Sequence, residues 1–162
     1  MLSKVKSFGL SGLEGFMVTV EVDVSASLPA CEIVGLPDAA VRESKERVRY
    51  AIKNSGFDYP VGRITVNLAP ADMKKEGSVY DLPIALGIIS ATGQLKGPMP
   101  DYIYLGELAL DGSIRGIHGL LPMVISASAQ GYDTFVVPSA NAPETSYISS
   151  VTAYGAASLK EA

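Results

Sequence analysis

Residues 63–88 read RITVNLAPADMKKEGSVYDLPIALGI and contain a strand, a long polar loop and the start of a helix, in that order. The apolar residues of RITVNLA alternate with polar ones, which is the period of a strand with one buried face. The following segment, DLPIALGIISATG (81–93), is apolar on nearly every side, so we expect a buried helix with Asp81 as its N-cap. The stretch therefore predicts a mixed α/β fold.

Two strands and a helix are predicted before this stretch. Residues 18–24 alternate valine with polar side chains, and residues 31–36 form a short apolar run that we expect to pair with them as a hairpin. Residues 38–56 carry apolar side chains at helical spacing. We expect this helix to be capped by Asp38 and to end at Gly56.

The C-terminal half shows strong turn chemistry. YIYLGELAL and SIRGI flank Asp111-Gly112, a pair typical of tight β-hairpins. The remaining predicted elements are a helix over 120–130 and strands over 134–138 and 151–156.

The length predicts one domain. The chain has 162 residues and is 48% apolar, which is enough to bury a core of ordinary size. Residues 158–162 resemble the first turn of a helix capped by Ser158. We therefore expect a domain over 1–157, followed at 158–162 by the start of a linker toward a further domain.

The sequence lacks the residues that several kinds of functional site require. One cysteine (Cys31) excludes an intramolecular disulfide and a cysteine-based zinc site, and one histidine (His118) excludes a multi-histidine metal site. No apolar run approaches the length of a membrane span, and no secretory signal is evident, so we expect a cytoplasmic protein. The motifs GxxxxGK[ST], GxSxG, HExxH and GxGxxG are absent.

Charge is distributed unevenly along the chain. The formal net charge is −4, yet residues 42–75 hold eight of the thirteen basic residues and only four of the seventeen acids. This segment is therefore positive and the rest of the chain is strongly negative. Such asymmetry can mark a face toward a polyanion, and a well-solvated helix with its flanking loops explains it equally well.

Three motifs carry a family resemblance: GLPDAAVRESKERVRYAIKNSGF (35–57), the stretch 63–88, and LGELALDGSIRGIHGLLP (105–122). In this order they resemble the bacterial ComM/YifB family of Mg-chelatase-like AAA+ ATPases, over nearly the whole chain. The resemblance implies an N-terminal domain with the fold of the Lon protease catalytic domain, a mixed sheet with packed helices. It also implies a downstream ATPase domain that uses ATP and Mg²⁺, a homo-hexamer in the full-length protein, and DNA branch migration during recombination and natural transformation.

The Lon-like resemblance raises the question of catalysis. Lon-type proteolysis uses a serine nucleophile and a lysine base, and the matching positions here are Val79 and Leu121. Neither side chain can carry the proton, so we expect a protease fold without protease chemistry and no catalytic residue in this domain. The alternative is a shifted dyad, with Ser78 as nucleophile and Lys74, Lys75 or His118 as base.

Metal chemistry has little support in the sequence. Asp72, Glu76 and Asp81 could approach one another near the loop 69–81, and oxygen ligands suit hard cations. Their spacing is irregular, and a helix cap with a solvated loop explains them better. We expect no metal and no cofactor in this part of the chain.

Two roles remain for the domain. In the first, it contacts DNA through phosphate neutralisation, because a motor must tolerate any sequence. In the second, it is an adaptor that assembles the ATPase ring, its basic residues pairing with acids of a neighbouring subunit. The candidate DNA contacts are Arg42, Lys45, Arg49, Lys53, Lys74 and Lys75.

Overall fold

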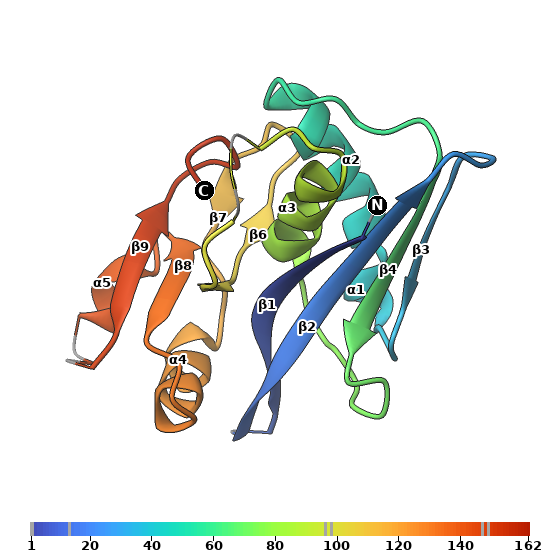
Figure 1. Cartoon of the computed structure of the whole chain (residues 1–162). Helices are drawn as coiled ribbons and strands as arrows, with labels where there is room; N and C mark the ends of the chain where they lie inside the picture. Colours follow the sequence, from blue (N-terminus) through green and yellow to red (C-terminus); the bar gives the residue numbers. More distant parts are fainter. Residues whose placement is uncertain (1, 13, 96, 98, 147, 149) are drawn as a thin grey trace.

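The computed structural model describes residues 2–12, 14–95, 97, 99–146, 148 and 150–162 (Figure 1). Nine strands are present in this part of the chain: β1 Leu2–Ser11, β2 Glu14–Ser25, β3 Ala30–Val34, β4 Arg63–Ala69, β5 Ile103–Tyr104, β6 Glu107–Leu108, β7 Ile114–Arg115, β8 Thr134–Pro138 and β9 Thr152–Ala156. The helices are α1 Ala39–Arg42, α2 Ser44–Asn54, α3 Asp81–Ala91, α4 Leu120–Ala129 and α5 Ala142–Thr145.

Seven strands form one mixed sheet in the order β3-β4-β2-β1-β5-β8-β9. Strand β2 pairs antiparallel with β1 and β4, whereas β3 pairs parallel with β4. The β1–β5, β5–β8 and β8–β9 pairs are also parallel. The predicted mixed α/β class with a mixed sheet and packed helices is confirmed.

The predicted hairpin between residues 18–24 and 31–36 is wrong. Both edges of β2 are occupied, by β1 and β4, so β3 lies on the far side of β4. The strand that displaced it, β1, was not predicted. Its Val5 and Ser7 face inward while Lys4 is exposed. Because a polar serine occupies an inward-facing position, the sequence shows only a weak alternation of apolar and polar residues.

The predicted helix over 38–56 is present as two consecutive helices, α1 and α2, that meet at Glu43. The Asp38 cap is confirmed, because its carboxylate accepts a hydrogen bond from the Val41 amide at 2.8 Å. Gly56 follows the helix with φ +86°, as expected for a glycine that ends a helix. The Asp111-Gly112 hairpin is also confirmed, since it joins β6 to β7.

Helices cover the two faces of the sheet unequally (Figure 1). Helix α3 packs on β1 and β2 from one face with α2 beside it, and α4 packs on the same strands from the other face. On the α3 face, Tyr104, Val136 and Tyr154 of β5, β8 and β9 share one row, and Leu86 of α3 lines a pocket with them. Helix α3 is buried along nearly its whole length, as its sequence predicts.

The last residues form a hydrogen-bonded turn. Glu161 and Ala162 donate backbone hydrogen bonds to the Ser158 carbonyl, and the Glu161 carboxylate accepts the Ala157 amide at 3.0 Å. The start of a linker or helix at 158–162 stays a prediction. None of the helices in the described part of the chain has the length and apolar character that crossing a membrane requires.

We predict that Gly35→Ala lowers the free energy of unfolding by about 2–4 kcal/mol. Gly35 has φ +103°, and a Cβ at this position would collide with the Leu68 carbonyl oxygen of β4. Gly56→Ala is the matched control. Its φ is also positive but nothing lies within 4 Å of the added Cβ, so only about 1 kcal/mol is expected. Urea denaturation of the two variants tests this; equal losses would contradict the predicted clash.

Candidate functional site

A buried ion pair joins α2 to α3. Arg47 Nε and Nη2 donate to the two carboxylate oxygens of Asp81, at 2.6 and 3.1 Å. Ser44 Oγ donates to the same carboxylate at 2.5 Å, and the Leu108 amide of β6 donates at 3.1 Å. Asp81 is fully buried and Arg47 is 22% exposed. Two helices and the β6–β7 hairpin are therefore held by one carboxylate.

This arrangement corrects the role expected for Asp81. Tyr80 precedes the helix without a side-chain capping bond, and Asp81 turns its carboxylate toward Arg47 instead. Burial raises the pKa of the Asp81 carboxyl, and the bonds from Arg47 and Ser44 act in the opposite direction. The carboxylate also raises the pKa of the Arg47 guanidinium. We regard the pair as ionised at neutral pH, because four donors converge on one carboxylate.

A pocket of about 560 Å³ lies beside the start of α3. Its carboxylates come from three places in the fold: Asp38 before α1, Glu76 in the loop after β4, and Glu107 in β6. We call it the acidic pocket. Ser78, Val79, His118 and Gly9 also line it.

One of the two positions matched to the Lon dyad lines this pocket. Val79 lines it and is 7% exposed, whereas Leu121 lies half-buried in the first turn of α4 and is not among the described lining residues. The structure brings Ser78 and His118 to the same pocket, but no hydrogen bond joins them among the described contacts. His118 is exposed in the turn before α4.

Lys75 differs from what the sequence predicts. A DNA contact has to be exposed, yet the Lys75 side chain is fully buried and its amine donates to the Pro70 carbonyl. Burial lowers the pKa of the amine. Because its amine is buried and bound to the Pro70 carbonyl, Lys75 does not reach a phosphate at the surface. We remove it from the DNA contacts.

The carboxylates considered for a metal do not converge. Asp81 is bound to Arg47, Asp72 is exposed, and Glu76 lies 3.8 Å from Lys74 Nζ at the surface. Within the described residues, no three histidine, cysteine, aspartate or glutamate side chains are placed to hold one metal ion.

A second pocket, of about 490 Å³, lies along α2. Lys45, Arg49 and Lys53 line it at successive turns of the helix, opposite Tyr59 and Cys31. We call it the basic pocket. Glu46 is the only acidic side chain among its described lining residues. Three of the six predicted DNA contacts are thus gathered around one concave surface.

The cations of this surface lack ion-pair partners in the described part of the chain. Arg42, Lys45, Arg49 and Lys53 form no ion pair within the described residues, whereas Arg47, Arg63 and Lys74 do. The Arg49 guanidinium lies 5.9 Å from the centre of the Tyr50 ring, close enough for a cation–π contact. Arg42 is exposed on α1 outside the basic pocket.

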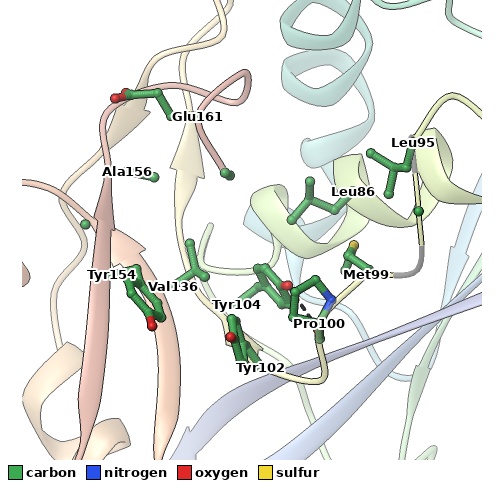
Figure 2. Close-up of a pocket in the computed structure, with 13 residues that line it drawn as sticks. Leu86, Leu95, Met99, Pro100, Tyr102, Tyr104, Val136, Tyr154, Ala156 and Glu161 are labelled. Carbon is green, nitrogen blue, oxygen red and sulfur yellow. Dashed lines mark hydrogen bonds between the residues drawn. The ribbon is translucent and has the colours of Figure 1, made fainter.

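A third pocket is mainly apolar and suits no phosphate. It measures about 730 Å³ and lies between α3 and strands β5, β8 and β9 (Figure 2). Tyr102 stacks on Tyr154 with ring centres 5.8 Å apart, and Tyr104 donates to the Pro100 carbonyl at 3.0 Å. Glu161 is its only charged side chain among the described lining residues.

Sequence reasoning missed most of the acidic pocket. Asp38 was interpreted only as a helix cap, and Glu107 was not considered. Nothing in their local sequence indicates that residues 69 positions apart lie around one pocket. Tyr59, which lines the basic pocket, follows α2 in an irregular segment and carries no periodic signal either.

Comparison with known proteins gives consistent matches. The family model described as subunit ChlI of Mg-chelatase matches residues 20–141. An uncharacterized protein of Mycobacterium tuberculosis is 41% identical over 161 residues, which is 98% of this chain and 32% of that protein. Competence protein ComM of Haemophilus influenzae is 42% identical over 159 residues, covering 98% and 31%. YifB of Escherichia coli is 45% identical over 131 residues, covering 80% and 26%. The chain thus spans about a third of the length of these relatives or less.

We predict that Asp81→Asn lowers the free energy of unfolding by about 3–5 kcal/mol, because Arg47 then loses its buried counter-charge. The control is Glu32→Gln, whose partner Arg63 is 43% exposed while Glu32 itself is 55% exposed. We expect that change to cost at most about 1 kcal/mol. Urea denaturation at neutral pH measures both. Similar losses in the two variants would show that the buried pair has no special role.

We also predict that Cys31 reacts slowly with iodoacetamide at neutral pH. Burial raises the pKa of its thiol above the ordinary value, so the thiolate fraction is small and the rate climbs only as pH rises above that value. Mass spectrometry of the alkylated chain against pH measures this. A rate that levels off below pH 8 would contradict it.

Proposed function

We propose that this chain, which belongs to the family of subunit ChlI of Mg-chelatase, binds DNA phosphates through α2 on behalf of a larger ATPase. The family match supports the expected resemblance to ComM and YifB. The observation that carries the proposal is the basic pocket, where three cations without ion-pair partners in the described chain line one concave surface.

The chemistry of this surface suits a phosphate backbone. Ammonium and guanidinium groups at successive turns of one helix provide several positive charges along a line, which matches the repeated charges of a nucleic-acid strand. Tyr50 holds the Arg49 guanidinium beside this surface. Base reading is not required, because phosphate contacts fix position without selecting sequence.

The comparisons add a direction to this proposal. One relative is named a competence protein. We take this name as support for a role of this chain at DNA. Branch migration, a hexameric ring and ATP hydrolysis concern the longer protein, and we propose them for it on the strength of the family resemblance alone.

The residues of this chain do not fit ATP. The motif GxxxxGK[ST] is absent, and Lys75, the lysine nearest before α3, is bound to the Pro70 carbonyl. No step through ATP or Mg²⁺ is therefore assigned to these residues. Protease chemistry is not assigned either, because Val79 and Leu121 carry no ionisable group.

Assembly is the second candidate role. The α2 surface is positive while the rest of the chain is strongly acidic, which favours head-to-tail contacts between copies. Sedimentation of the chain without DNA separates the two roles. Association that rises with concentration and is lost in Arg49→Ala/Lys53→Ala would support assembly through the same surface.

We predict that Arg49→Ala/Lys53→Ala weakens DNA binding equally on unrelated sequences. The salt slope of log K against log [salt] should fall in magnitude by about 2, because two phosphate contacts are lost. Fluorescence anisotropy with labelled duplexes at several salt concentrations measures this.

The matched control is Arg115→Ala/Lys160→Ala. It removes the same two residue types from exposed positions on β7 and the C-terminal turn, so net charge changes equally. This control should keep nearly the full salt slope. An unchanged slope in the α2 variant, or an equal loss in both, would remove α2 from the proposal.

A further inference from the structure

Two exposed apolar side chains lie beside the basic pocket. Leu28, in the loop between β2 and β3, is 84% exposed, and Val61, in the loop between α2 and β4, is 90% exposed. These are the highest exposures of any large apolar side chain in the described part of the chain. Val61 lines the basic pocket, and Leu28 precedes Pro29, which also lines it. Single exposed apolar side chains are common in globular proteins, so it is their joint position beside one pocket that indicates a contact surface.

The backbones of the two loops hold them together. The Ala30 amide donates to the Gly62 carbonyl at 3.3 Å. A Cβ on Gly62 would collide with the Ser25 carbonyl oxygen, so the loops could not approach this closely with any other residue at that position. Both loops lie at the same end of the sheet, where β2 ends and β4 begins (Figure 1). The two apolar side chains are therefore carried by one packed end of the sheet.

Proline limits the freedom of both loops further. Pro29 follows Leu28 and Pro60 precedes Val61, and each proline ring fixes its own φ. A loop that is already ordered loses little conformational entropy when a ligand binds. Covering the two side chains removes apolar surface from water, which favours binding. These loops therefore suit the contact of a partner with an apolar surface.

The charge of the neighbouring residues selects the partner. Lys45, Arg49 and Lys53 line the same pocket as Val61, so a partner that covers this surface is anionic as well as apolar. A DNA strand has both properties side by side when its bases are unpaired, because its phosphates repeat along one edge and its base faces are open. In an intact duplex the bases are stacked on one another, and only the phosphates and the groove edges are accessible. An apolar rim beside a row of cations therefore suits an unpaired strand better than a duplex.

We propose that Leu28 and Val61 contact the open base faces of an unpaired DNA strand. The cations of the basic pocket hold the phosphates of the same strand. This inference rests on the proposed function, since it names the form of DNA that the α2 surface binds. Apolar side chains pack well against bases that have left their stack. Such a contact selects no sequence, because every base has an open face of this kind.

Fluorescence anisotropy with two labelled probes tests the inference: a short oligothymidine strand and a blunt duplex of the same length. We expect Leu28→Ser/Val61→Ser to weaken binding of the single strand about tenfold and binding of the duplex less than about twofold. The salt slope should stay that of the original chain for both probes, because this variant removes no charge. Arg49→Ala/Lys53→Ala, by contrast, should weaken binding of both probes.

The matched control is Leu2→Ser/Ile125→Ser. Leu2 on β1 and Ile125 on α4 are 57% and 53% exposed, and neither is among the described residues that line the basic pocket. We expect this control to bind both probes as the original chain does.

The outcomes separate this inference from the proposed function. Equal losses in the loop variant and the control, or equal losses of the loop variant on both probes, would overturn the base contact and leave phosphate binding by α2 in place. A chain that binds neither probe would overturn the proposed function, and this inference with it.

Nuclear magnetic resonance of the unaltered chain gives a second readout. The methyl signals of Leu28 and Val61 should shift with the single strand and stay unchanged with the duplex, whereas the amide signals of α2 should shift with both. Methyl signals that respond to neither probe would contradict the base contact. Methyl shifts caused by polyglutamate but not by the single strand would assign the surface to an acidic polypeptide and would overturn the inference.

Discussion

The carboxylate of Asp81 is the point on which the arrangement of α2, α3 and the β6–β7 hairpin depends. Removing a charged group from water is costly, and only a complete set of donors offsets that cost. Arg47, Ser44 and the Leu108 amide provide that set from two other elements. The pair therefore fixes orientation as well as proximity, because an apolar contact would tolerate sliding that these directional bonds do not.

This constraint places the two charged pockets relative to α2. Arg47 is the only basic residue of α2 directed inward, while Lys45, Arg49 and Lys53 line the outer pocket. The fixed hairpin also brings Glu107 toward Asp38 and Glu76. The basic pocket and the acidic pocket thus share no described lining residue and differ in the charge of their side chains.

The sequence predicts local structure here better than it predicts pairing. The valine alternation, the Asp38 cap and the Asp111-Gly112 turn depend on neighbouring residues, and each is confirmed. The pairing partner of residues 31–36 depends on which strands occupy the two edges of β2. Local patterns carry no such information. The Asp81 cap failed for a related reason, because a distant arginine competed for the same carboxylate. Burial of Lys75 likewise required the fold of the loop around Pro70.

The strand order has a consequence for how the molecule comes apart. Strands β1 to β4 and helices α1 to α3 come from residues 2–91 and are joined by long antiparallel ladders. Strands β5, β8 and β9 attach to them through a β1–β5 ladder with a single matched pair, Lys6 and Ile103. The β1–β5 pairing has the fewest matched residues in the sheet. The outer three strands therefore form a part of the chain with lower local stability. Opening along the β1–β5 pairing would expose Tyr104 and Val136, which are 3% and 7% exposed in the closed sheet, beside Tyr154, which is already 52% exposed.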